Sequence, residues 1–201
     1  MKARLETRLR LAGRDSLMEF YCPETFLPYC QACPDYGARW SCPPYDEPLP
    51  RLEEYAGAYL LSVKILYNGK TRSETKGAQA VQAVYRRAVG RVKILAEDWA
   101  LEQQHRLPGS LALACGGCQR CPRCARQDGL PCRRPETPRF SLESMGFDAA
   151  GIADKLLDQT MLWAGDSLPA YHLLIGGLLW PGGPAPEEPC LPPVLAGNDG
   201  D

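Results

Sequence analysis

The sequence predicts an α/β or α+β fold, built as a small mixed sheet with flanking helices and two cysteine-rich metal-binding loops. Three observations support this class. Residues 3–11 alternate between apolar and polar side chains, which is typical of a half-buried strand. Residues 58–67 and 172–180 are short apolar runs of the length that buried strands have. Residues 74–105 repeat apolar side chains at helical spacing and therefore predict one long helix.

The first half of the chain begins with a strand that we expect at a sheet edge, because one of its faces is basic and should be exposed to solvent. That side of residues 3–11 carries Arg4, Glu6, Arg8 and Arg10. A short helix is expected to begin at Asp15 or Ser16 and to run to Tyr21. Another short helix is expected over residues 47–55, before the next strand.

The second half of the chain predicts a crossover unit. The helix over 74–105 leads to a short strand at 110–114, which should run parallel to the preceding strand. The cysteine-rich loop then leaves the carboxyl end of that strand, where open α/β sheets usually bind ligands. A helix over 149–164 and a strand over 172–180 follow, and we expect His172 to be exposed at the strand start. The polar face of the long helix carries Arg86, Arg87, Lys93, Glu97 and Glu102.

Composition narrows the class of protein. Residues 1–180 are expected to form one domain, and residues 181–201, rich in Pro, Gly and acids, are expected to be disordered. A formal net charge of −1 gives the whole molecule no field that would attract nucleic acid or a membrane. No transmembrane segment or signal region is recognisable, so we expect a cytoplasmic protein. There, ten cysteines and two histidines indicate metal or redox chemistry based on sulfur and not disulfides.

The main motif is a run of closely spaced cysteines between residues 115 and 132. Cys118-x2-Cys121-x2-Cys124 places three thiols on one loop, and Cys132 follows after a turn. Three close thiolates and a fourth from beyond a turn are how proteins hold an iron–sulfur cluster, and we predict a 4Fe–4S cluster here. An alternative ligand set takes Cys115 with Cys118 and Cys121, and leaves Cys124 outside.

A second cysteine group precedes the first strand of the crossover unit. Cys30-x2-Cys33 has a chelating spacing, and Cys42 follows beyond a glycine turn. We predict that these three thiols also bind metal. The fourth ligand stays open at this point: it is Cys22, a water, a substrate or a cysteine of the other group.

Arginines concentrate around the first cysteine run. Between residues 118 and 139 there are six arginines and two acids, a local excess of +4: Arg120, Arg123, Arg126, Arg133, Arg134 and Arg139 against Asp128 and Glu136. A four-thiolate cluster is negative, so nearby guanidinium groups stabilise it, the reduced form most of all. The same patch is also consistent with docking of an acidic protein or a phosphate-bearing molecule, or with a solvated surface.

Three segments together resemble a known family. They are Cys30-x2-Cys33-Pro34-x-Tyr36-Gly37-x2-Trp40-Ser41-Cys42-Pro43-Pro44, then Cys118-x2-Cys121-x2-Cys124-x7-Cys132-Arg133-x-Pro135, and then Ser141-Leu142-Glu143-x2-Gly146-x-Asp148. From about residue 15 to 180 the chain is similar to a widespread prokaryotic family of predicted metal-binding proteins of unknown function. The resemblance implies a cytoplasmic iron–sulfur or other metal-binding protein with these seven cysteines as candidate ligands, and implies no reaction. The chain departs from the family at Phe140, at the additional Cys115 and in its acidic tail.

Together these features predict a metal-binding protein that carries a 4Fe–4S cluster for electron transfer or supply to a redox partner protein. The alternative is a zinc-binding structural or interaction protein, in which thiolate sites only hold loops in place. A third interpretation is a protein that passes its metal on. No nucleotide-binding or catalytic-triad pattern occurs, so the sequence names neither a substrate nor an enzymatic activity.

Overall fold

A four-stranded sheet forms the centre of the computed structural model, which describes residues 4–183, 186–187, 189–192 and 195. Its strands are β1 (Arg4–Gly13), β2 (Tyr55–Leu66), β3 (Leu111–Leu113) and β4 (Tyr171–Pro181), in the order β1-β2-β4-β3. The predicted α/β class and the edge position of the first strand are confirmed.

The connection from β2 to β3 runs through the long helix α4 (Ala78–Arg106). β2 and β3 point in the same direction, as the strand–helix–strand pattern predicts, because both are antiparallel to β4. They are not neighbours, however, since β4 from the end of the chain is inserted between them. This insertion corrects the predicted mixed sheet: neighbouring strands in the described part of the chain are antiparallel throughout.

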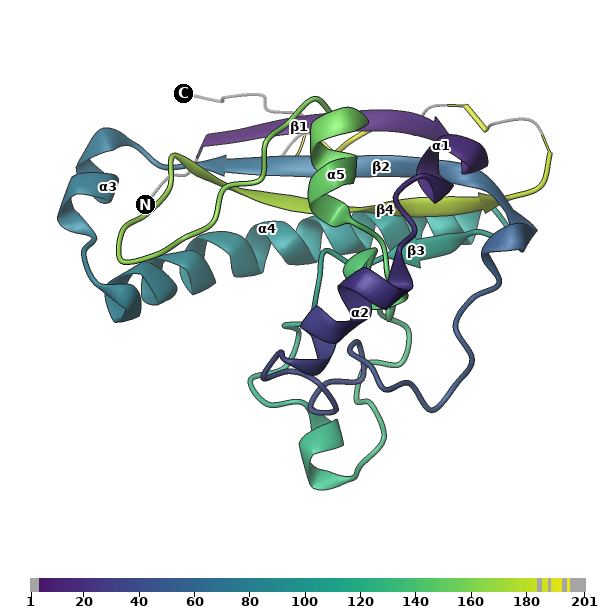
Figure 1. Cartoon of the computed structure of the whole chain (residues 1–201), viewed down its shortest axis with the longest axis horizontal. Coiled ribbons are helices and arrows are strands. Elements are labelled where there is room, and N and C mark those ends of the chain that lie inside the picture. Colours follow the sequence, from purple (N-terminus) through teal and green to yellow (C-terminus); the bar gives the residue numbers. More distant parts are fainter. Residues whose placement is uncertain (1–3, 184–185, 188, 193–194, 196–201) are drawn as a thin grey trace.

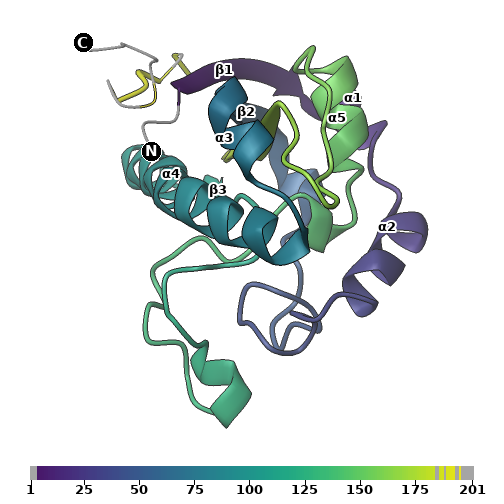
Figure 2. The same ribbon diagram turned by 90° about the vertical axis from the view of Figure 1, so that its left-hand side faces the viewer.

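Helices cover both faces of the sheet (Figures 1 and 2). Successive side chains of a strand point to opposite faces, and β2 is apolar on both. Leu61 and Val63 pack beneath α4, whereas Leu60 packs on the other side. There the sheet is covered by α1 (Arg14–Met18) and α5 (Ala149–Lys155). The core is therefore split by the sheet into two apolar layers.

The prediction of a helix over residues 47–55 is wrong. Only a single 3-10 turn, η1 (Leu52–Glu54), forms there. Pro48 and Pro50 explain the difference, because proline lacks a backbone N–H and disfavours helical geometry in the residue before it.

The helix predicted over residues 149–164 is shorter than expected. Asp148 caps it, because its carboxylate accepts a hydrogen bond of 2.9 Å from Gly151 N, but the helix ends at Lys155. Asp158 then adopts a left-handed backbone conformation with φ of 52°, which no α-helix continues through. Trp163, near the end of the predicted range, lies outside the helix and is 79% exposed.

Two helices were not predicted. α2 (Pro23–Gln31) has a proline at its first position, where the missing N–H costs nothing. α3 (Gly69–Glu74) follows Asn68, whose side chain caps it by accepting a hydrogen bond of 2.8 Å from Thr71 N.

Several described residues of the tail contact the body. Cys190 O accepts a hydrogen bond of 3.0 Å from Trp99 Nε1, and Leu195 is buried against the α4 side of the core. Disorder was predicted for all of residues 181–201. Of these, 184–185, 188, 193–194 and 196–201 lie outside the described residues. Among the described helices, none has the length and apolarity to cross a membrane.

His172 is buried instead of exposed, which corrects the expectation from the sequence. It is 8% exposed, and its Nδ1 atom shares a hydrogen bond of 2.8 Å with the Tyr67 hydroxyl. The rings of Tyr67 and Tyr85 both meet the imidazole edge to face. Burial lowers the pKa of His172, because the imidazolium would lose its hydration.

This burial predicts a pH-dependent stability. An unfolded histidine takes up its proton near pH 6.5, whereas folded His172 does so only at lower pH, so protons favour the unfolded chain. The contribution of neutral His172 to the free energy of unfolding, measured in urea, should therefore be fully present above about pH 7. It should decrease as the pH drops toward about 5.5. His172→Gln should lose this component, while the exposed His105→Gln should keep it. Equal pH dependence in the two variants would contradict the assignment.

Candidate metal centre

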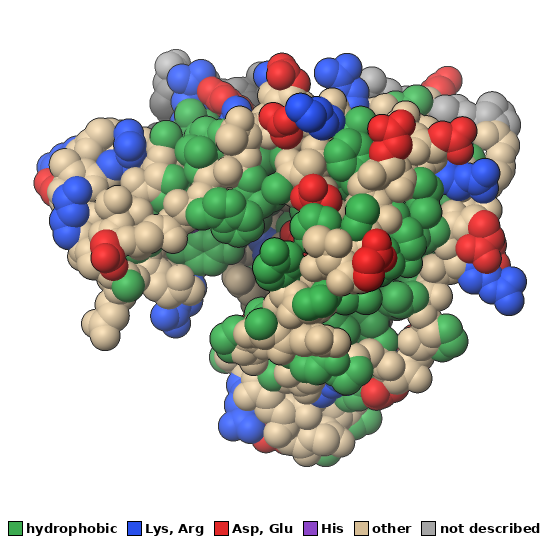
Figure 3. Space-filling view, viewed as in Figure 1, with side chains coloured by type: hydrophobic (Ala, Val, Ile, Leu, Met, Phe, Trp, Pro, Cys, Tyr) green, Lys and Arg blue, Asp and Glu red, His purple; other side chains and the backbone are tan. Residues whose placement is uncertain are grey.

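The predicted ligands lie in a part of the molecule that we call the cysteine lobe, residues 22–46 and 116–139. It extends from the carboxyl end of β3, the position predicted from the crossover unit (Figure 1). The surface is hollowed between this lobe and the end of the molecule that carries α3 (Figure 3). All ten cysteines of the chain are free, so no disulfide holds the lobe together.

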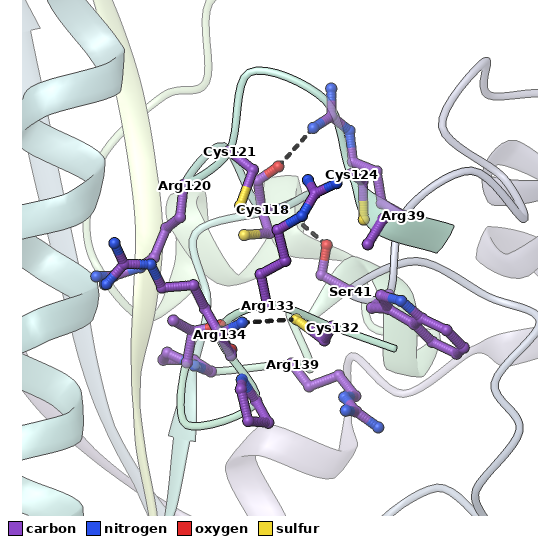
Figure 4. A pocket seen from close by; sticks show the side chains of 15 residues that line it. Arg39, Ser41, Cys118, Arg120, Cys121, Cys124, Cys132, Arg133, Arg134 and Arg139 are labelled. Carbon is purple, nitrogen blue, oxygen red and sulfur yellow. Dashed lines mark hydrogen bonds between the residues drawn. The ribbon is translucent and has the colours of Figure 1, made fainter. Parts of the chain in front are cut away.

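Cys118, Cys121, Cys124 and Cys132 line one pocket (Figure 4). All four thiols are half-buried. Among the described residues, no three Cys, His, Asp or Glu side chains are placed to hold a single metal ion. The four ligands of a cubane cluster bind four different iron atoms, so they surround a volume instead of meeting at one point. Four soft sulfur donors around one pocket fit such a cluster in their chemistry.

Three consecutive residues tie the two cysteine loops together. Arg39 Nη1 donates a hydrogen bond of 2.7 Å to Cys118 O, and Cys118 N donates one of 2.7 Å to Ser41 Oγ. Trp40 Nε1 donates one of 3.1 Å to Leu130 O. The segment just before Cys42 therefore fixes the backbone near both ends of the loop that carries Cys118, Cys121 and Cys124.

Arg126 makes the reverse connection. Its Nη1 atom donates hydrogen bonds of 3.0 Å to Arg39 O and 2.8 Å to Cys42 O, and Nη2 donates to Pro44 O. Its guanidinium also lies over the Trp40 ring, 4.9 Å from the centroid. Arg126 was predicted as one charge of a basic patch, but the structure uses its donors to join the loops.

Cys30, Cys33 and Cys42 lie beside this pocket and do not line it. Cys30 is at the end of α2, and Cys33 follows in an exposed turn. Cys42 lies close to the loop of residues 116–132: a Cβ on Gly117 would be 3.3 Å from the Cys42 sulfur. Burial raises the pKa of the Cys42 thiol to about 11, with smaller contributions from the charges of Asp35 and Cys33. The two predicted cysteine groups are thus neighbours in one lobe.

The remaining cysteines are elsewhere. Cys115 is buried against β4, where a Cβ on Gly176 would come within 2.7 Å of its sulfur. Burial raises the pKa of this thiol to about 12. Cys22 occupies the position just before α2 without a capping hydrogen bond from its side chain, and Cys190 is exposed in the tail. None of the three lines the pocket.

A buried ion pair on α4 holds the start of the loop that carries Cys118, Cys121 and Cys124. The sequence had placed both members of the pair on the polar face of the helix. Lys93 and Glu97 are 2% and 1% exposed, and 3.7 Å separates Lys93 Nζ from Glu97 Oε1. Lys93 Nζ donates hydrogen bonds of 2.6 Å to Cys115 O and 2.5 Å to Gly117 O. Glu97 Oε1 accepts one of 3.4 Å from Cys115 N.

Arg120 extends this network to the other side of Cys118. Its Nε lies 3.5 Å from Glu97 Oε2, and its Nη2 lies 2.6 Å from Asp98 Oδ1. Burial raises the pKa of Glu97, while the positive charges of Lys93 and Arg120 oppose that rise. A helical-wheel comparison would have found the pair, because positions 93 and 97 fall on the same stripe as buried Val89, Ala96 and Ala100.

The arginines that line the pocket differ in how their charge is balanced. The three less exposed ones each pair with a carboxylate: Arg39 with Asp35 at 2.8 Å, Arg120 with Asp98 at 2.6 Å and Arg139 with Glu47 at 2.7 Å. Arg133 and Arg134 are exposed and have no carboxylate partner among the described residues. Arg134 N instead donates to Cys132 Sγ at 3.4 Å. Net positive charge at the pocket therefore comes from these two residues.

With this site in view, the comparison with known proteins is informative. Residues 21–175 match the family of predicted metal-binding proteins DUF2284, so the chain belongs to that family. The matched region contains both cysteine groups. No curated protein and no solved structure matches the chain.

The buried pair yields a stability prediction. Lys93→Met should lower the free energy of unfolding by about 3 kcal/mol, because it leaves the Glu97 carboxylate buried with only Arg120 to balance it. Lys93→Met combined with Glu97→Leu should cost less than the single substitution, since no unbalanced charge remains at that position. Urea denaturation measures both. The control is Lys70→Met, which breaks the exposed Lys70–Glu74 pair and should change stability by less than about 0.5 kcal/mol.

Proposed function

We propose that this protein holds a 4Fe–4S cluster on Cys118, Cys121, Cys124 and Cys132 and transfers or supplies electrons to a redox partner protein. The supporting observation is that these four thiols, one of them from beyond a turn, line the same pocket. A cluster bound there would supply one-electron chemistry. A reducing, cytoplasmic compartment agrees with ten free cysteines.

The surroundings of Cys115 favour this ligand set over the one that includes Cys115. The Cys115 thiol is packed against Gly176 in the sheet, and Lys93 and Glu97 hold its backbone from the helix side. Moving this sulfur to the pocket would disrupt those contacts. Cys132, in contrast, already lines the pocket with the three cysteines of the close-spaced run.

Cys30, Cys33 and Cys42 are proposed as a second metal centre. They lie in the same lobe, and the Cys33 thiol is close enough for its charge to act on both Cys30 and Cys42. Three thiols leave one ligand position for another group.

A zinc-binding structural role is the second candidate, and the make-up of the lobe favours it. Cys22–Asp46 and Gly116–Arg139 contain few fully buried apolar side chains in the described structure, Ala125 among them. The lobe depends mainly on backbone hydrogen bonds and ion pairs, so a metal would add cross-links that its apolar contacts do not provide.

Metal content and colour distinguish the two functions. Anaerobically purified protein should be brown, contain about four iron and four sulfide per cluster, and absorb near roughly 400 nm with bleaching on reduction. Cys121→Ser should abolish this cluster, whereas Cys115→Ala and the tail variant Cys190→Ala should retain it. A colourless protein with stoichiometric zinc would instead support the structural role.

The unpaired arginines predict a tuning effect on the cluster. Arg133→Gln with Arg134→Gln should lower the reduction potential by on the order of tens of millivolts, because two positive charges that favour the more negative reduced state are lost. Protein-film voltammetry measures the midpoint. The matched control is Arg86→Gln with Arg87→Gln, which removes the same charge from an exposed part of α4. An equal midpoint in both double variants would refute the tuning role.

A further inference from the structure

A carboxylate oxygen that is buried and has no hydrogen-bond partner lies beside the second cysteine group. The Oε2 atom of Glu143 is buried and makes no hydrogen bond to any described residue. Buried polar atoms in native proteins are nearly always paired, so an unpaired one indicates an ion, a water or a reacting group at that place. A bound cation satisfies a carboxylate oxygen directly.

The position of Glu143 is fixed by its neighbours. It belongs to the turn η3 (Glu143–Met145), which packs against α2. The backbone carbonyl of Glu143 accepts a contact of 3.7 Å from Cys30 Sγ. Cys22 N donates a hydrogen bond of 3.0 Å to Gly146 O, which ties the start of α2 to the end of the turn. Glu143 is therefore held next to Cys30 by two separate contacts between the same elements.

The other carboxylates near these thiols are already engaged. Asp35, whose charge acts on Cys42, pairs with Arg39 at 2.8 Å. Glu97, whose charge acts on Cys118, pairs with Lys93 and Arg120. The charge of Glu143 acts on the Cys30 thiol and also on Tyr85 and Cys115, and no cation among the described residues pairs with it. It is thus the carboxylate near the cysteines that is available for a metal.

We propose that Glu143 supplies an oxygen ligand that completes a divalent-metal site with Cys30, Cys33 and Cys42. The inference rests on the second metal centre of the proposed function and answers which group fills its fourth position. Three thiolates and one carboxylate match the donors and the tetrahedral count that zinc prefers. The four side chains do not already converge on one point, so binding requires side-chain rotation, for which the exposed Cys33 is free.

Zinc-edge X-ray absorption tests this ligand set without interference from iron in the neighbouring pocket. Full-length protein is purified anaerobically, its four-thiol pocket is first filled with iron and sulfide so that zinc cannot occupy it, and one equivalent of zinc is then added. The spectrum should show three sulfurs at about 2.3 Å and one oxygen at about 2.0–2.2 Å. Competition with a chromogenic chelator should show Glu143→Gln weakening zinc binding at least about 10-fold. Glu143→Cys should restore tight binding and change the spectrum to four sulfurs.

The control is Glu136→Gln, an exposed glutamate of the same lobe, which should bind zinc like the wild type. Four sulfurs in the wild-type spectrum, or an unchanged affinity in Glu143→Gln, would overturn the assignment. If Cys33→Ser loses the zinc and Glu143→Gln does not, the second centre stands without Glu143. If the wild-type protein takes no zinc at this site, the second centre fails together with the inference, while the 4Fe–4S proposal is tested separately by the iron content and by Cys121→Ser.

Discussion

The Lys93–Glu97 pair is the contact on which the geometry of the candidate site depends most. A helix of 29 residues packed on the sheet is a rigid support, and this pair transfers its position to the loop. Through Cys115, Gly117 and Arg120 it fixes the chain both before and after Cys118. Apolar side chains of similar volume would be at least as stable there. The role of the polar pair is therefore to fix the conformation of the loop and not to add stability.

The lobe is built on the opposite principle from the rest of the molecule. Around the sheet, stability comes from apolar burial on two faces, whereas the lobe is joined by donors reaching backbone carbonyls, as Arg39, Trp40 and Arg126 do. Such contacts fix geometry at little net gain in stability. This explains why thiols that are far apart in the sequence come near one pocket without an apolar core beneath them.

The sequence predicted those parts of the structure that depend on local pattern. Strands β2 and β4, helix α4 and the exit of the cysteine loop from β3 all follow from periodicity and spacing, and the metal-binding family from the cysteine motifs. The insertion of β4 between β2 and β3 was beyond reach, because strand pairing over such a separation leaves no local signal. The burial of Lys93, Glu97 and His172 was missed because charge or polarity was taken as exposure. The ligand assignment itself stays a prediction.

The charge balance of the pocket bears on how a negative cluster would be accommodated. Guanidinium groups that are paired with carboxylates of the protein contribute dipoles and little net field, and this describes Arg39, Arg120 and Arg139. Arg133 and Arg134 keep their full charge and follow directly after Cys132 in the chain. The field that favours a reduced cluster would therefore enter from the exposed side. The same two residues are exposed, so the charge that would tune the bound group is also presented to solvent at the mouth of the pocket.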